Sequence, residues 1–171
     1  MSPTAESASA QRARTVYLIA SVYHALRATR LEPALKPLGI TPLQYTIMTV
    51  VESHEGLSSA QLSRRFYVAP QTMGQVLAGL EERALLRRKE DPENRRVLLV
   101  SLTAKGRKLV DECGRLIGAI ETEIFDDPDC PQTAALREQL QRISSHLRNN
   151  STPPVAAADA PKRRKRTPAP A

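Results

Sequence analysis

One contiguous stretch, residues 57–103, constrains the fold of this chain more than any other. Ser58 and Gln61 lie three positions apart, the spacing of a capping box in which each side chain bonds a backbone donor at a helix start. A first helix is therefore predicted over residues 59–67. A second helix is predicted to begin at Pro70, because a proline in the first turn lacks only an N–H that would have had no intrahelical partner.

The second helix has two chemically different faces. At about 100° per residue, apolar side chains share one face, and short or amide-bearing side chains share the other. The apolar face holds Met73, Val76, Leu77 and Leu80, and the other face holds Gln71, Gln75, Ala78 and Glu82. Side-chain amides, together with the Thr72 hydroxyl, suit insertion into the major groove of DNA, where Gln can make two hydrogen bonds to adenine. A helix that only faces solvent is the alternative.

The residues that follow predict a two-stranded hairpin. Residues 86–91 and 96–102 have the composition of strands, and the Pro-Glu-Asn-Arg sequence at 92–95 is typical of a turn. The hairpin carries five cations, which are Arg87, Arg88, Lys89, Arg95 and Arg96. An arginine pair at a protruding tip suits contact with phosphate or with the minor groove. Simple solvation is the alternative, because three carboxylates on the same hairpin offset part of the charge.

A helix, a turn, a second helix and a hairpin in this order resemble the winged helix-turn-helix of the MarR (multiple antibiotic resistance regulator) family. The segments that carry the resemblance are GLSSAQLSRRF, VAPQTMGQVLAGLEERALL and RRKEDPENRRVLLVSLTAKGRKL, and it extends over residues 14–147. The resemblance implies a mainly α fold with a small β-wing, in which N- and C-terminal dimerisation helices flank the winged helix-turn-helix. It also implies a transcriptional regulator that binds DNA.

Two positions depart from the pattern that is usual in this family. The wing usually reads D-P-x-D-x-R, and Asn94 replaces the second acidic residue, so a salt bridge that commonly braces the wing arginine would become a weaker hydrogen bond. Arg96 itself is in place. The exit of the second helix is usually the glycine of E-R-G-L, and Ala84 stands there, although glycine adopts the left-handed cap conformation most easily. Neither departure removes a predicted DNA contact.

The residues before this stretch predict two helices. The first, over residues 11–30, continues as a kinked or broken extension to residue 40, because Pro33 and Pro37 interrupt it. The second runs over residues 42–53. Its start signal is strong, since a threonine caps, a proline occupies the first turn and a glutamine completes the capping box.

Two long amphipathic helices are predicted after the hairpin. Thr103 caps one that extends to about residue 125, and the other spans residues 131–148. Their apolar stripes are too long for one small domain to cover. The simplest partner is a second copy of the chain, with the first, fifth and sixth helices packed across a two-fold axis. The resemblance places dimerisation in the same helices, so a homodimer is expected.

This pattern divides the chain into three parts. Residues 1–10 are expected to form a flexible N-terminus, and residues 11–148 one MarR-like domain. Within that domain, 11–40 and 103–148 are the expected dimerisation helices, and 41–102 is the expected DNA-binding lobe. Residues 149–171 are rich in proline and alanine around a KRRKR run, and are expected to be a disordered basic tail. The tail is either only solvated or adds non-specific phosphate contacts.

Charge, cysteine content and hydropathy narrow the class of protein. The net charge of +7 and the pI near 9.8 favour a polyanionic partner. Cys113 falls on an apolar stripe and is expected to be a buried hydrophobe, whereas Cys130, at a helix start, could be more exposed and more acidic. No secretion signal and no membrane span is predicted, so a cytoplasmic location is expected. The histidines fit no metal or catalytic motif, and neither enzyme activity nor a cofactor is predicted.

The predicted DNA contacts follow from this arrangement. Base-edge contacts are expected from the second helix, phosphate or minor-groove contacts from the hairpin, and DNA-backbone contacts from the first helix. The candidates are Pro70, Gln71, Thr72 and Gln75 on the second helix, Arg88, Asn94, Arg95 and Arg96 on the hairpin, and Ser59 and Arg64 on the first helix. A dimer places two such helices about 34 Å apart or slightly less, so the expected partner is double-stranded DNA with a palindromic operator.

Many members of the resembled family are released from DNA by small aromatic or phenolic acids, which bind between the dimerisation helices and the DNA-binding lobe. The candidates for such a site are Tyr17, Tyr23, His24, Arg27, Tyr45 and Met48. Packing or capping of the core is their alternative role. The chain is thus predicted to be a homodimeric, sequence-specific repressor. A protein-interaction module and a non-specific, nucleoid-type DNA binder are the alternatives.

Overall fold

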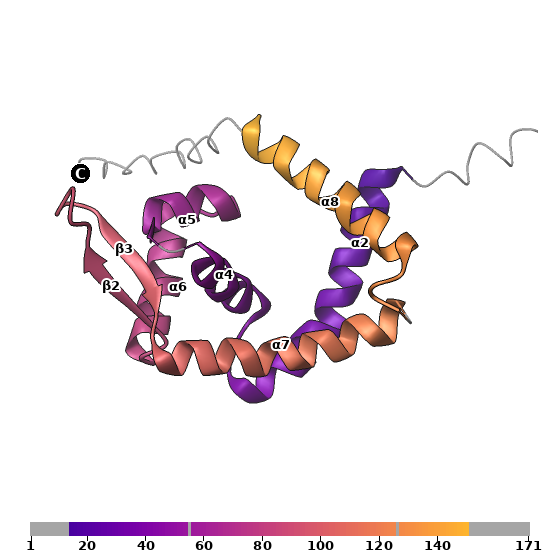
Figure 1. Cartoon of the computed structure of the whole chain (residues 1–171), viewed down its shortest axis with the longest axis horizontal. Coiled ribbons are helices and arrows are strands. Elements are labelled where there is room, and N and C mark those ends of the chain that lie inside the picture. Colours follow the sequence, from indigo (N-terminus) through magenta and orange to yellow (C-terminus); the bar gives the residue numbers. More distant parts are fainter. Residues whose placement is uncertain (1–13, 55, 126, 151–171) are drawn as a thin grey trace, which may run out of the picture.

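The structure, a computed structural model, describes residues 14–54, 56–125 and 127–150. Figure 1 shows a mainly helical chain with one small antiparallel sheet, as the sequence predicts. One lobe contains α4, α5, α6 and the sheet, and α2, α7 and α8 form an arm beside it. The expected flexible N-terminus at 1–10 lies outside the described residues, as does the basic tail from residue 151 onward.

The first helical segment changes its winding but does not break. Helix α2 (Thr15–Leu26) continues into the π-helix η1 (Arg27–Leu31), then α3 (Glu32–Leu35) and the 3-10 turn η2 (Lys36–Leu38). The expected interruption at Pro33 is therefore a local π-turn. Because Pro33 has no N–H to bond the carbonyl of Thr29, that carbonyl accepts instead from Nη1 of Arg30 at 3.2 Å.

Both predicted capping boxes are present and fix where α4 and α5 begin. Helix α4 (Pro42–Ser53) starts where the Oγ1 of Thr41 accepts from the Gln44 N–H, and the Gln44 side chain accepts from the Thr41 N–H at 3.0 Å. Helix α5 (Ser59–Phe66) has the same reciprocal pair between Ser58 and Gln61. Each box satisfies donors that the first turn would otherwise leave without partners.

The sheet contains a short strand that the sequence pattern did not predict. Its strands are β1 (Leu57–Ser58), β2 (Leu86–Glu90) and β3 (Leu98–Leu102), in the order β1-β3-β2. The hairpin strand β3 begins at Leu98 and not at residue 96. The tip is longer than predicted because the backbone N–H of Val97 bonds the carbonyl of Asn94 at 2.8 Å, which closes a turn before the strand starts.

The hydrophobic core lies inside the lobe, between the helices and one face of the sheet. It includes Leu62 of α5, the buried face of α6 (Pro70–Glu82), and Val100 of β3. Helix α7 (Ala104–Phe125) closes the core with its N-terminal half. A side chain at Gly106 would collide with the carbonyl of Leu85, so the close approach of α7 to the lobe requires a glycine there.

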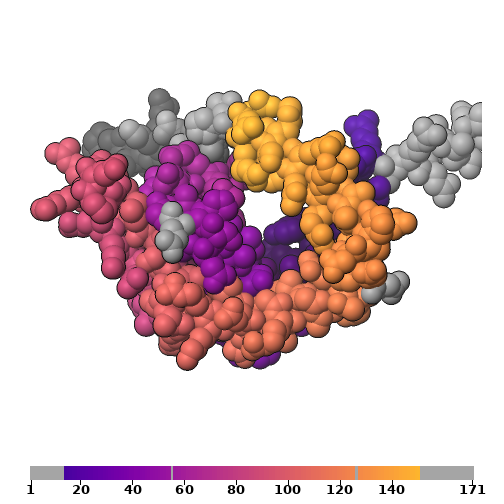
Figure 2. Space-filling view, in the orientation of Figure 1, coloured from indigo at the N-terminus to yellow at the C-terminus, as the bar shows by residue number. Residues whose placement is uncertain are grey.

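The arm, by contrast, has little packed against it. Neither α2 nor α8 (Pro131–Asn149) contains a buried residue, although both carry many apolar side chains. Those that are exposed include Val16, Tyr17, Leu18, Ile19, Val22 and Tyr23 on α2, and Leu136, Leu140, Ile143 and Leu147 on α8. Figure 2 shows open space between the lobe and this arm. Among the described residues, no helix combines the length and apolarity needed to cross a membrane.

Candidate nucleic-acid interface

Helix α6 presents the polar face that the sequence predicts. Met73, Leu77 and Leu80 point into the core, whereas Gln71 and Gln75 are exposed. Thr72 and Pro70 are exposed beside them in the first turn. This face is free of charged side chains over its first two turns, so amide and hydroxyl groups are what α6 offers to a partner.

The turn between α5 and α6 is fixed by a buried serine. Ser63, only 5% exposed, donates from its hydroxyl to the carbonyl of Val68 at 2.7 Å, and the Val68 N–H bonds the carbonyl of Ser63 at 3.2 Å. These bonds hold the entry to α6 against α5. On α5 itself, Arg64 is exposed and Ser59 is half-buried near the helix start.

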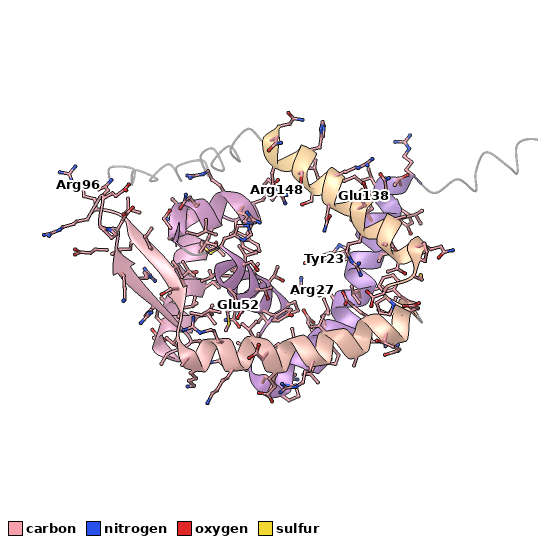
Figure 3. The ribbon with its side chains drawn as sticks, in the orientation of Figure 1. Tyr23, Arg27, Glu52, Arg96, Glu138 and Arg148 are labelled. Atoms are coloured by element: carbon pink, nitrogen blue, oxygen red, sulfur yellow. The ribbon has the colours of Figure 1, made fainter. Side chains whose placement is uncertain are left out.

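The tip of the hairpin carries the arginine pair and protrudes from the lobe. Arg95 and Arg96 are both exposed in the turn, and Figure 3 shows Arg96 at the far end of the hairpin, away from the helices. Asn94 is also exposed, and its Oδ1 accepts from the backbone N–H of Arg96 at 3.2 Å. The Asn94 side chain therefore braces the backbone of the tip. The guanidinium of Arg96 is not the group that bonds to it.

Arg88, one of the predicted DNA contacts, is paired with a carboxylate of the protein itself. Its Nη2 lies 2.7 Å from Oε2 of Glu81, and the two side chains are only 26% and 30% exposed. Its Nε is buried without a partner among the described residues. Arg88 thus joins the middle of strand β2 to α6. Its contact with DNA stays a prediction, and the ion pair shows that Arg88 also positions strand β2 against α6.

The C-terminal end of α6 is tied to the rest of the lobe by its backbone and by Arg83. Ala84 adopts the left-handed conformation with φ 55°, which is the backbone conformation that glycine usually supplies at a helix end. The Arg83 guanidinium donates to the carbonyls of Gly39 and Leu38 at 2.6 and 3.1 Å, and Lys105 Nζ donates to the carbonyl of Arg83 at 2.9 Å.

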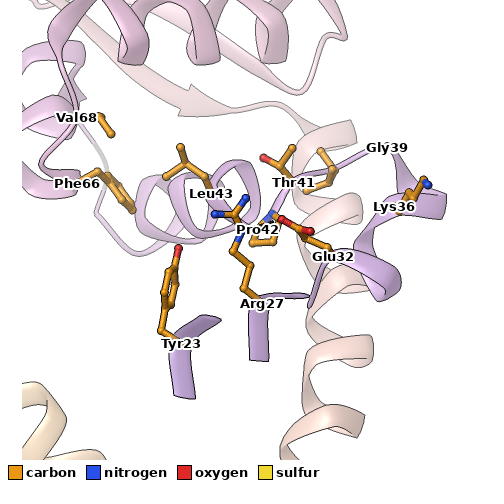
Figure 4. A pocket seen from close by; sticks show the side chains of 11 residues that line it. Tyr23, Arg27, Glu32, Lys36, Gly39, Thr41, Pro42, Leu43, Phe66 and Val68 are labelled. Carbon is orange, nitrogen blue, oxygen red and sulfur yellow. Dashed lines mark hydrogen bonds and ion pairs between the residues drawn. The ribbon is translucent and has the colours of Figure 1, made fainter. Parts of the chain in front are cut away.

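A cavity of about 700 Å³ lies between α2 and the lobe that contains α4, α5 and α6. Tyr23 and Arg27, two of the predicted effector-site residues, line it (Figure 4). The complete lining is Tyr23, Arg27, Glu32, Lys36, Gly39, Ile40, Thr41, Pro42, Leu43, Phe66 and Val68. Arg27 Nε lies 2.7 Å from Oε1 of Glu32, and this hydrogen-bonded carboxylate raises the pKa of the guanidinium. The cavity therefore combines aromatic and aliphatic surface with a paired cation.

The other predicted effector-site residues lie elsewhere. Met48 is 1% exposed in the core, because it falls on the inner face of α4. Tyr45 lines a second cavity of about 490 Å³ between α2, α4 and α7, and burial raises the pKa of its hydroxyl. Tyr17 and His24 are exposed on α2 and are not part of the first cavity's lining. Sequence reasoning missed Glu32, since the segment that carries it was predicted to be broken.

The two cysteines differ as their sequence contexts predict. Cys113 is 1% exposed on α7, and burial raises the pKa of its thiol. Cys130 is half-buried at the N-cap of α8, where hydrogen bonds from Thr133 lower its pKa. Within residues 14–54, 56–125 and 127–150, no three His, Cys, Asp or Glu side chains gather as metal ligands would.

The chain is similar to known proteins over both the lobe and the arm. A family model described as the MarR family matches residues 38–97. Over 129 residues, the chain is 31% identical to the HTH-type transcriptional repressor Rv2887 of Mycobacterium tuberculosis, across 75% of this chain and 92% of that protein. The crystal structure of the M. tuberculosis MarR family protein Rv2887 with salicylic acid superimposes with a TM-score of 0.63 at 30% identity, over 78% and 98% of the two chains. Wild-type MarR from Escherichia coli, at 22% identity, shares the fold, with a TM-score of 0.67 over 78% and 98%.

Proposed function

We infer, since the chain belongs to the MarR family of winged-helix transcriptional regulators, that it is a homodimeric repressor of a specific DNA operator. We further propose that a small aromatic carboxylate bound in the cavity beside Arg27 releases it from DNA. The observation that carries the DNA-binding part is the exposed face of α6, where Gln71 and Gln75 flank the Thr72 position.

We assign recognition of the DNA sequence to α6 and general affinity for DNA to the hairpin tip. Side-chain amides bond base edges in the major groove, so Gln71 and Gln75 supply discrimination among sequences. The guanidinium groups of Arg95 and Arg96 supply contact with phosphate or with the minor groove, which strengthens binding to every sequence. Arg64 and Ser59 on α5 are proposed to contact the DNA backbone beside α6.

Dimerisation is proposed from the apolar arm. Helix α2 has no buried residue, yet Val16, Val22 and Tyr23 are more than half exposed at 78%, 63% and 55%. A helix that is apolar on several sides is normally surrounded by protein. A second copy packed through α2, α7 and α8 supplies that cover, and it sets the two α6 helices about 34 Å apart or slightly less on a palindromic operator.

The effector class is proposed from the lining of the cavity and from the relative. The M. tuberculosis MarR family protein Rv2887 was crystallised with salicylic acid. In this chain, Tyr23, Phe66 and Leu43 offer surface for an aromatic ring, and Arg27 offers a cation for a carboxylate. Lys36 adds a second cation to the same lining.

Selection of bound sequences from random double-stranded DNA tests the DNA-binding proposal. A palindromic consensus is expected. Gln75→Ala is then expected to weaken binding by about 1 to 3 kcal/mol at one operator position and to relax the base preference there. Gln139→Ala, the same change on the exposed surface of α8, is the matched control and should leave the preference unchanged. Absence of any consensus would favour a non-specific binder.

Light scattering on the purified chain tests the dimer. A stable dimer is expected without added partners. Leu140→Glu, on the exposed apolar stripe of α8, should shift it toward monomer, whereas Gln139→Glu should not. A monomeric parent chain would contradict the proposal and favour a module that docks another protein.

A further inference from the structure

The cavity beside Arg27 contacts the segments that hold both ends of α6. Phe66 and Val68 form one part of its lining and immediately precede the start of α6 at Pro70. Gly39 forms another part of the lining (Figure 4). Its carbonyl accepts a hydrogen bond from Arg83, at the C-terminal end of α6. A molecule in this cavity therefore lies between two anchors of the same helix.

Arg83 is the anchor at the C-terminal end. It is the residue that follows α6, and its two Nη atoms donate to the carbonyls of Gly39 and Leu38 at 2.6 and 3.1 Å. A guanidinium is a rigid planar fork, so two bonds from it fix the direction of the bonded segment as well as its distance. These carbonyls end the η2 turn, where unsatisfied acceptors favour a cation.

The segment whose carbonyls Arg83 bonds continues along the cavity as part of its lining. Gly39 leaves η2 in the left-handed conformation with φ 65°, and Ile40, Thr41 and Pro42 follow it in the lining. The capping box at Thr41 makes this corner stiff. A displacement of residues 39–42 is therefore transmitted to Arg83, because the segment moves as a stiff unit.

The anchor at the N-terminal end is fixed to a different element. Val68 is held on both its N–H and its carbonyl by Ser63 of α5. The two anchors of α6 therefore belong to different elements of the lobe, α5 at one end and the η2 to α4 corner at the other. A small displacement of one element relative to the other would change the tilt of α6.

We propose that Arg83 couples occupancy of the cavity to the orientation of α6. This inference rests on the proposed function, because it assumes that the cavity binds an effector and that α6 reads DNA. A bound aromatic carboxylate moves residues 39–42 relative to Val68, and Arg83 carries that movement to the C-terminal end of α6. A ligand shifts such an equilibrium only by its difference in affinity between the two orientations, so the effect is measurable as a coupling factor.

A thermodynamic cycle with sodium salicylate as the probe tests the proposal. The affinity of the full chain for its selected operator is measured with and without saturating salicylate, and salicylate affinity is measured by calorimetry. In the parent chain, salicylate is expected to weaken operator binding at least about fivefold. Arg83→Gln is expected to keep the salicylate affinity within about twofold and to reduce the coupling factor below about twofold.

Two further variants make the result decisive. Arg107→Gln removes the same charge from the exposed first turn of α7, leaves the Arg83 bonds in place and should keep the parent coupling factor. Arg83→Lys keeps the charge but cannot hold both carbonyls with a planar fork, so it should lose most of the coupling. It also decides the question if circular dichroism shows that Arg83→Gln does not fold.

The possible failures are distinguishable. A folded Arg83→Gln or Arg83→Lys chain that retains the full coupling factor overturns the role of Arg83 and leaves the proposed function standing. A parent chain whose operator affinity does not respond to salicylate overturns the proposed effector and the coupling with it. Hydrogen exchange provides a second readout, since salicylate should change protection of the α6 amides in the parent chain but not in Arg83→Gln.

Discussion

Arg88 Nη2 lies 2.7 Å from Glu81 Oε2, which joins the middle of strand β2 to helix α6. The pair is largely shielded from solvent and fixes strand β2 against α6, while the hairpin tip with Arg96 extends away from the helices. In the proposed function, these two elements contact DNA together. The ion pair therefore sets their relative position before DNA is bound.

Glu81→Gln is expected to weaken binding to the selected operator about threefold to fivefold, or about 0.7 to 1 kcal/mol, because it loosens this junction. The direction of this change in affinity is informative, because removal of a carboxylate near DNA would by charge alone strengthen DNA binding. Glu82→Gln removes the same charge from the exposed neighbouring position and should bind DNA slightly more tightly. Fluorescence anisotropy at fixed salt measures both. If Glu81→Gln and Glu82→Gln change the operator affinity equally, the pair has no positioning role.

Arg96→Ala is expected to weaken binding to all DNA sequences alike and to lower the slope of log affinity against log salt by about 1, because one phosphate contact is lost. The backbone bond from Arg96 to Asn94 survives this substitution, so the fold of the tip is retained. Arg142→Ala, on the exposed surface of α8, serves as the charge-matched control. A parent-like salt slope in Arg96→Ala would show that the tip does not contact DNA.

Ala84→Gly is expected to stabilise the chain by about 0.5 to 1 kcal/mol. Ala84 is exposed and held at φ 55°, so the substitution relieves backbone strain without removing buried surface. The gain is reduced by the greater freedom of glycine in the unfolded chain. Urea unfolding followed by circular dichroism measures the difference. Gly39→Ala, at φ 65°, is the reverse test and should destabilise by a similar amount. A loss of stability in Ala84→Gly would contradict this account.

Features set by neighbours in the sequence were predicted well. The capping boxes at Thr41 and Ser58 involve side chains three residues apart, and both helix starts were confirmed. The two faces of α6 follow from its own periodicity and were also confirmed. The departure at Ala84 was located correctly, because a helix that must turn into a strand at this point needs a left-handed residue whatever its side chain.

Features set by distant contacts were not predicted. β1 is only two residues long and is a strand because it pairs with β3, where Leu57 lies opposite Val100. The role of Arg88 depends on Glu81, which reaches it across a helix-to-strand junction. Met48 was assigned to the effector site, but α4 is packed by other elements on more than one side, so its buried surface is wider than a single stripe predicts.

Glu32→Gln is expected to raise the affinity for salicylate about threefold, because it removes the carboxylate that pairs with Arg27. The reason is competition, since Oε1 of Glu32 already lies 2.7 Å from the Arg27 Nε that an effector carboxylate would bond. Neutral salicylamide is the matched ligand control, because it has the ring and the hydroxyl but no carboxylate to compete. Calorimetry should therefore show tighter salicylate binding in Glu32→Gln and unchanged salicylamide binding. If both ligands gain equally, the substitution has enlarged the cavity and the Arg27–Glu32 pair does not restrain the effector.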